Sequence, residues 1–74
     1  MIKDRDIAEK VSQALREAYR ELDESIWLVQ AECSEAEANI YRHLVGNILG
    51  RIVFDVMEPL YKEQPQLKPP AWDD

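Results

Sequence analysis

The stretch Ser34-Glu35-Ala36-Glu37 decides how this chain folds, because it has the sequence pattern of a capping box. In this motif the serine hydroxyl accepts a hydrogen bond from the backbone N–H three residues later, and the glutamate carboxylate accepts one from the serine N–H. A helix is therefore expected to begin there, with acidic residues at the positive end of its dipole. Only Glu32 and Cys33 separate it from the preceding helical segment, so the two helices are predicted to form an antiparallel hairpin.

Upstream of the capping box, a first helix is predicted from about residue 4 to residue 31. This segment contains no Gly or Pro. Its apolar and small residues recur in alternating steps of three and four, which is the heptad spacing of helices that pack along a seam. Additional apolar residues on both sides of the seam indicate contact with more than one neighbour. The seam contains Ala8, Val11, Leu15, Ala18, Leu22, Ser25 and Val29, and its flanks contain Ile7, Ala14, Tyr19, Ile26 and Leu28.

Downstream, a second helix is predicted from about residue 34 to residue 62. At about 100° per residue, its apolar side chains cover more than half of the helix circumference, which is more than one neighbouring helix can bury. Two hairpins are therefore expected to pair into a homodimeric four-helix bundle. The apolar residues are Ile40, Tyr41, Leu44, Val45, Ile48, Leu49, Ile52, Val53, Val56 and Met57. The shared core is expected to contain Leu15, Leu22, Ile48 and Ile52.

Prolines mark the end of the helical region. Pro59 has no amide hydrogen, and in an α-helix its ring presses on the carbonyl of Asp55, so a kink or a stop is expected there. Residues 64–74 are rich in proline and are predicted to form an extended, acidic tail outside the hydrophobic core. The chain is thus predicted to be all-α, with a helical hairpin at residues 1–63 and a Pro-rich tail at residues 64–74.

Length and charge argue against several classes of function. The chain has 74 residues and a formal net charge of −6. Nucleic-acid binding needs a basic face, so no nucleic-acid partner is expected. The longest apolar stretch, residues 44–57, is shorter than a membrane span and contains Arg51 and Asp55, and an acidic surface disfavours anionic lipid, so no membrane association is expected. We expect a cytoplasmic protein whose target surface is basic.

The single cysteine and the single histidine limit the chemistry of the chain. Cys33 alone excludes an internal disulfide, and Cys33 with His43 excludes the usual zinc sites. The residues four positions before and after His43 are asparagines, so its helix supplies neither a nucleophile nor an acidic partner. We therefore expect no cofactor, no metal and no enzymatic activity. The alternative is a metal-dependent or enzymatic helical bundle that uses His43 and nearby acidic residues such as Glu37.

Two glycines in the second helix are candidates for partner binding. Gly46 and Gly50 lie one turn apart, although each glycine destabilises a helix by roughly 1 kcal/mol relative to alanine. They allow either a close helix crossing inside the bundle or a groove for a partner. The same side of the helix is expected to carry Asn39, His43, Phe54, Met57 and Tyr61.

Two tryptophans are the largest side chains of the chain. Trp27 is expected to pack under the hairpin turn, because an indole buries a large area. In the tail, Leu67 and Trp72 are the large apolar side chains available to contact the bundle or a partner. The sequence thus predicts a small acidic interaction module, an adaptor or inhibitor, that acts as a homodimer and binds another protein. The candidate partner-binding residues are Gly46, Gly50, His43, Phe54, Leu67 and Trp72.

Overall fold

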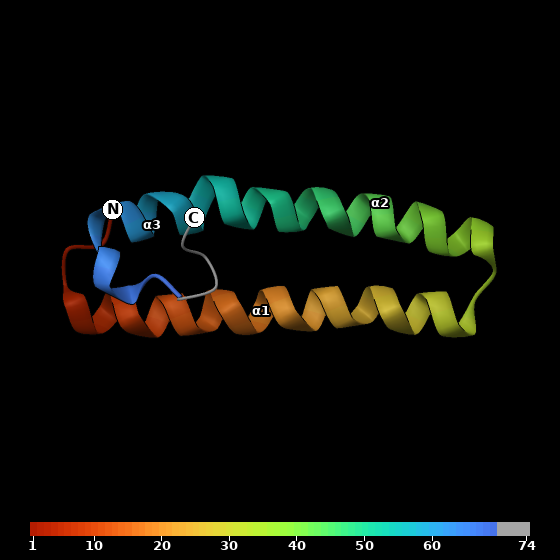
Figure 1. Cartoon of the computed structure of the whole chain (residues 1–74), viewed down its shortest axis with the longest axis horizontal. Helices are drawn as coiled ribbons and strands as arrows, with labels where there is room; N and C mark the ends of the chain where they lie inside the picture. Colours follow the sequence, from red (N-terminus) through yellow and green to blue (C-terminus); the bar gives the residue numbers. More distant parts are fainter. Residues whose placement is uncertain (70–74) are drawn as a thin grey trace.

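The computed structural model describes residues 1–69, and within them the fold is an antiparallel pair of long helices (Figure 1). The described residues contain no strand, so the all-helical hairpin expected from the sequence is confirmed. The elements are α1 (Arg5–Glu32), α2 (Glu35–Arg51), the π-helix η1 (Ile52–Met57), α3 (Glu58–Glu63) and the 3-10 turn η2 (Pro65–Leu67).

The hairpin turn has the predicted capping box. The Ser34 hydroxyl accepts a hydrogen bond from the Glu37 N–H at 3.1 Å, and the Glu37 carboxylate accepts one from the Ser34 N–H at 3.1 Å. The preceding helix ends where the Cys33 N–H donates to the Val29 carbonyl. Each helix end is thus capped by the turn residue next to it, Cys33 for α1 and Ser34 for α2, so two residues are enough to reverse the chain.

The core lies between the two long helices and is richest at the end away from the turn. Ala8 and Ser12 are the buried residues of α1, and α2 buries Ala38, Val45 and Leu49. Near the chain ends, Ala8 forms a cluster with Met57, Leu60 and Tyr61. Two serines of α1 bond to tyrosines across the interface, Ser12 to Tyr61 at 2.6 Å and Ser25 to Tyr41 at 2.7 Å. These bonds fix the register of the hairpin.

The π-helix η1 changes which residues face the core. Met57 and Tyr61 were expected on the side of Gly46 and Gly50, and this prediction is wrong, because both are only 4% exposed and belong to the core. A π-helix pairs each N–H with the carbonyl five residues back and so has more residues per turn than an α-helix. The side chains after η1 are therefore rotated relative to an uninterrupted α-helix, and Met57, Leu60 and Tyr61 turn toward α1.

The π-helix also accommodates Pro59 without ending the helical path. The Glu58 N–H donates to the Val53 carbonyl, five residues back, just before the proline. The α-helical spacing that presses a proline ring on the carbonyl four residues back is thus not kept through this stretch. Consequently α3 continues in the direction of α2, and Pro59 lies in its first turn (Figure 1).

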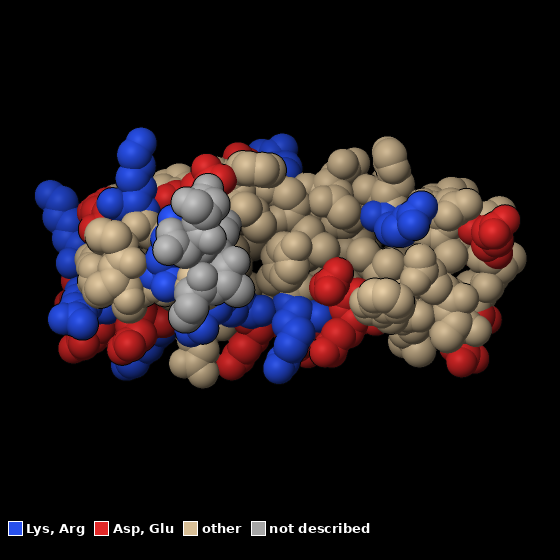
Figure 2. Space-filling model, viewed as in Figure 1, with Lys and Arg blue, Asp and Glu red and all other residues tan. Residues whose placement is uncertain are grey.

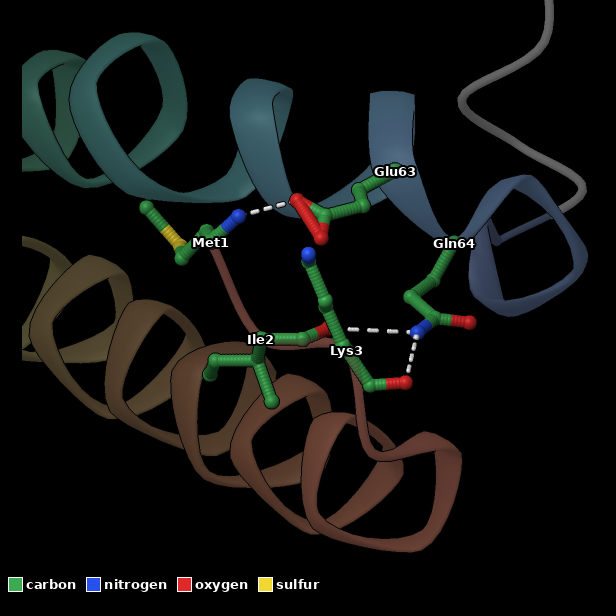
Figure 3. Close-up of polar contacts among 5 residues, drawn as sticks. All are labelled: Met1, Ile2, Lys3, Glu63 and Gln64. Atoms are coloured by element: carbon green, nitrogen blue, oxygen red, sulfur yellow. Dashed lines mark hydrogen bonds and ion pairs between the residues drawn. The ribbon is translucent and has the colours of Figure 1, made fainter.

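Residues 64–67, the first part of the predicted extended tail, are folded against the hairpin, whereas residues 70–74 of that tail lie outside the described residues. The buried Gln64 side chain donates to the carbonyls of Ile2 and Lys3, both at 3.1 Å, and the Met1 amino group pairs with the Glu63 carboxylate (Figure 3). Leu67, at the end of η2, packs against the core. We call these contacts of residues 1–3 with Glu63 and Gln64 the clasp. The sequence pattern did not predict the clasp, because it joins residues about 60 positions apart in the chain.

The hairpin is elongated. Its Cα atoms extend 45 × 21 × 16 Å, and their radius of gyration is 14.5 Å, against about 11 Å for a compact domain of this length. Two helices bury only the sides that face each other, so both broad faces of the hairpin remain uncovered along α2. No helix in residues 1–69 has the length and the hydropathy needed to cross a lipid bilayer.

Candidate functional site

The hairpin leaves an unusual number of large apolar side chains in solvent, which makes its two faces the candidate functional surfaces. Isolated exposed apolar residues are normal, but contiguous ones indicate an interaction surface. Those on the two long helices and η1 are Ile7, Tyr19, Trp27, Leu28, Ile40, Leu44, Ile48 and Phe54.

One face carries a groove between the two helices, which we call the glycine groove. Its volume is about 620 Å³. Gly46 and Gly50 lie in its α2 wall, and Trp27 and Phe54 are its largest exposed side chains, at 67% and 66% exposure. The complete lining is Tyr19, Asp23, Ile26, Trp27, Gln30, Arg42, Gly46, Leu49, Gly50, Val53 and Phe54.

The two glycines face open space. A Cβ atom placed on Gly46 or Gly50 would meet no atom within 4 Å. Within the described residues, α1 therefore makes no close crossing at either glycine. A close crossing inside a bundle of two copies stays a prediction. The glycines instead form a smooth part of the groove wall, where another chain can approach the α2 backbone.

Trp27 does not pack under the hairpin turn, so that prediction is wrong. The run Ile26-Trp27-Leu28-Val29 is apolar throughout, but successive residues of a helix point about 100° apart. Ile26 and Val29 are half-buried toward α2, whereas Trp27 and Leu28 are exposed. Trp27 thereby becomes a wall of the glycine groove.

The opposite face of the hairpin carries a second apolar surface, the aliphatic ridge, defined as Ile40, Leu44 and Ile48. These residues recur every four positions of α2 and are 63%, 58% and 50% exposed. At about 100° per residue they lie on the side of α2 opposite Gly46 and Gly50. On α1, Ala14 and Ala18 lie on the side opposite Asp23 and Trp27, and both alanines are exposed.

Charge is distributed unevenly around these surfaces. From Ala38 to Phe54 the sequence contains no Asp or Glu. Arg42 lines the glycine groove and bonds only weakly to Asn39, at 3.5 Å, whereas Arg51 pairs with Asp55 at 3.0 Å. Figure 2 shows the face with the groove, where uncharged side chains cover most of α2 and acidic side chains gather at the ends and along α1.

The remaining candidate residues lie apart from these surfaces. His43 is exposed and does not line the groove, and Cys33 is exposed at the turn. Leu67 contacts the core of its own hairpin, while Trp72 lies outside the described residues. Within residues 1–69, no three His, Cys, Asp or Glu side chains are placed to hold a metal ion.

The glycine groove includes residues that the sequence did not nominate. Gly46, Gly50 and Phe54 were candidates and do line it, but its α1 wall of Tyr19, Asp23 and Trp27 was not predicted. The sequence signal that could have indicated this α1 wall is Tyr19, an aromatic residue that lies outside the heptad seam. The chain matches no family model, no curated protein and no solved structure.

Proposed function

We propose that this protein is a helical interaction module, an adaptor or inhibitor, that acts as a homodimer paired through the aliphatic ridge. The observation that carries the proposal is the exposure of Ile40, Leu44 and Ile48, which are at least half exposed in the middle of a regular helix. Burying each such side chain contributes about 1.5 to 3 kcal/mol. A second copy offers the matching surface.

A second copy can present a small residue opposite one large residue of the ridge. The bond between Ser25 and Tyr41 sets the antiparallel register, so Ile48, seven residues after Tyr41, lies level with Ala18, seven residues before Ser25. A two-fold axis parallel to the helices keeps residues level and places α2 of one copy on α1 of the other. Ile48 then faces the small Ala18 of the second copy, and Ala14, eleven residues before Ser25, lies level with Ile52, one turn beyond the ridge.

The available area is also sufficient. A hairpin face 45 Å long and 21 Å wide covers about 900 Å². Each partner in a standard protein interface buries about 800 Å². Pairing along the whole face would produce a four-helix bundle and leave the glycine groove of each copy on the outside, accessible to another protein.

Light scattering coupled to gel filtration tests the proposal with a matched pair of variants. The wild-type chain, 8.6 kDa, is expected to elute with twice that mass at micromolar concentration. Leu44→Glu places an unpaired carboxylate in the interface and should give the monomer mass, whereas Phe54→Glu, on the opposite face, should remain dimeric.

The outcomes separate the two faces. A wild-type monomer overturns the proposal, and so does a monomeric Phe54→Glu beside a dimeric Leu44→Glu, which would make the groove the dimer interface. Circular dichroism of each variant checks that the helices persist. Ile40→Glu repeats the test at a second ridge position, in case Leu44→Glu fails to fold.

A further inference from the structure

We infer that the chain's own residues 70–74 cover one end of the glycine groove, with Trp72 docked on Phe54. The inference goes beyond the proposed dimer and does not rest on it, because the groove and the aliphatic ridge lie on opposite faces of the hairpin. Three observations carry it: the place where the described chain ends, the number of residues that follow, and the apolar surface within their reach.

The described chain ends beside the groove. Leu67 and Val53 both pack against the buried cluster around Leu60, and Val53 also lines the groove. After α3 the chain reverses over α1 and runs back toward the middle of the hairpin (Figure 1). Pro69, the last described residue, is half-buried. The following residues therefore start from the surface of the hairpin, close to the groove wall at Val53.

The remaining length of chain is sufficient to reach one end of the groove. Residues 70–74, Pro-Ala-Trp-Asp-Asp, lie outside the described residues. Trp72 follows Leu67 by five residues, which span at most about 17 Å. Phe54 precedes Met57, a member of the cluster, by three residues, or about 5 Å along the helix axis. The other end of the groove, at Arg42, lies about 18 Å beyond Phe54 and is out of reach.

The end of the groove that lies within reach has an uncovered aromatic surface. Phe54 is 66% exposed and stands beside the half-buried Val53. An indole ring carries a large apolar area and stacks favourably on another aromatic ring. Ile48, the nearest residue of the aliphatic ridge, is six residues farther from the cluster than Phe54 and lies on the opposite face. Phe54 is therefore the better match for Trp72.

The covalent link favours this occupant over a separate protein. A side chain joined to its site by a few residues is present at an effective concentration on the order of millimolar. Pro69 and Pro70 also restrict the linking chain, which lowers the conformational entropy lost on docking. Another protein that uses the Phe54 end of the groove must then displace Trp72, whereas the end at Trp27 and Arg42 stays open.

Acrylamide quenching of tryptophan fluorescence tests the inference in the full-length chain. Trp27 and Trp72 are the two tryptophans, so Trp27→Phe leaves Trp72 as the single emitter and keeps an aromatic ring at position 27. Docking on Phe54 covers one face of the indole, so adding Phe54→Glu to this chain should raise the quenching constant about twofold. Adding Leu44→Glu instead is the matched control on the opposite face, and it should leave the quenching constant unchanged.

A quenching constant that does not respond to Phe54→Glu overturns the inference, because Trp72 is then either free or bound elsewhere. An equal rise with Leu44→Glu also overturns it and places Trp72 at the ridge. If dilution of the Leu44→Glu chain releases Trp72, the tail binds another copy, which is equally incompatible. The mass of each chain tests the proposed dimer and quenching tests the tail, so the two fail by different measurements.

Two further measurements keep the test decisive. Circular dichroism checks that the helices persist in each variant, and Phe54→Ala replaces Phe54→Glu if the charged variant fails to fold. In the wild-type chain, nuclear Overhauser contacts are expected between the ring protons of Trp72 and those of Phe54. Contacts of the Trp72 ring with Ile7 or Ile48 in their place would overturn the inference.

Discussion

The Tyr61 hydroxyl lies 2.6 Å from Ser12 Oγ, in a buried hydrogen bond between side chains 49 positions apart. Tyr61 reaches this position because the π-helix η1 rotates the side chains of α3, so that Tyr61 faces α1. The bond ties the last helix of the chain to the first and satisfies two polar groups inside the core. It is therefore the clearest place to test whether η1 forms in solution.

Tyr61→Phe should lower the free energy of unfolding by about 1 to 2 kcal/mol in urea melts, because the buried Ser12 hydroxyl loses its partner. The double variant Ser12→Ala/Tyr61→Phe removes both polar groups and should cost less than the sum of the two single variants. Strictly additive losses would show that the two side chains do not interact.

Ser34→Ala should destabilise the protein by about 1 kcal/mol, since the N–H of Glu37 loses its acceptor at the start of α2. Chemical denaturation measures this loss. Ser34→Asp keeps an acceptor at the same position and serves as the control, with a much smaller expected effect. An unchanged stability of Ser34→Ala would contradict the capping role.

Gln64→Ala should cost about 1 to 2 kcal/mol, because the carbonyls of Ile2 and Lys3 lose their donor. Gln64→Glu should cost more, since a carboxylate oxygen would then face two carbonyl oxygens. Gln30→Ala, at an exposed glutamine near the turn end of α1, makes the same change away from the clasp and should stay within about 0.5 kcal/mol of the wild type. If all three variants unfold alike, the clasp does not contribute to stability.

Gly50→Ala is expected to stabilise the hairpin by up to about 1 kcal/mol, because alanine is the better helix former and its Cβ meets no other atom. Thermal or urea unfolding of the two chains gives the comparison. A destabilised variant would reveal a neighbour packed on Gly50 in solution. Gly46→Ala repeats the measurement one turn earlier.

The elements set by local sequence were predictable. The capping box at Ser34 and the heptad spacing of α1 act within one or two turns, so the start of α2 and the reversal of the chain follow from neighbouring residues. The candidates Gly46, Gly50 and Phe54 were nominated in the same way, from their spacing on one helix.

The remaining features depend on tertiary contacts. Nothing in the residues Ile52–Met57 distinguishes a π-helix from an α-helix, and its formation orients Met57 and Tyr61 toward a core that exists only after the hairpin closes. Trp27 was assigned to the core because its neighbours in the chain are apolar. Of the residues 26–29, however, only Ile26 and Val29 lie on the inner face of α1. The α1 wall of the groove likewise required the pairing register of the two helices.

If two copies pair through the aliphatic ridge, the stability of the protein should depend on its concentration. If two copies fold together, dilution favours the unfolded monomer, and each tenfold change in concentration shifts the apparent free energy of unfolding by about 1.4 kcal/mol. The melting temperature measured by circular dichroism should therefore rise from micromolar to hundreds of micromolar chain. In Leu44→Glu, whose ridge carries a carboxylate, the melting temperature should be lower and independent of concentration. A wild-type melting temperature that does not change over this range would mean that each hairpin folds alone and that Ile40, Leu44 and Ile48 are exposed in the functional protein.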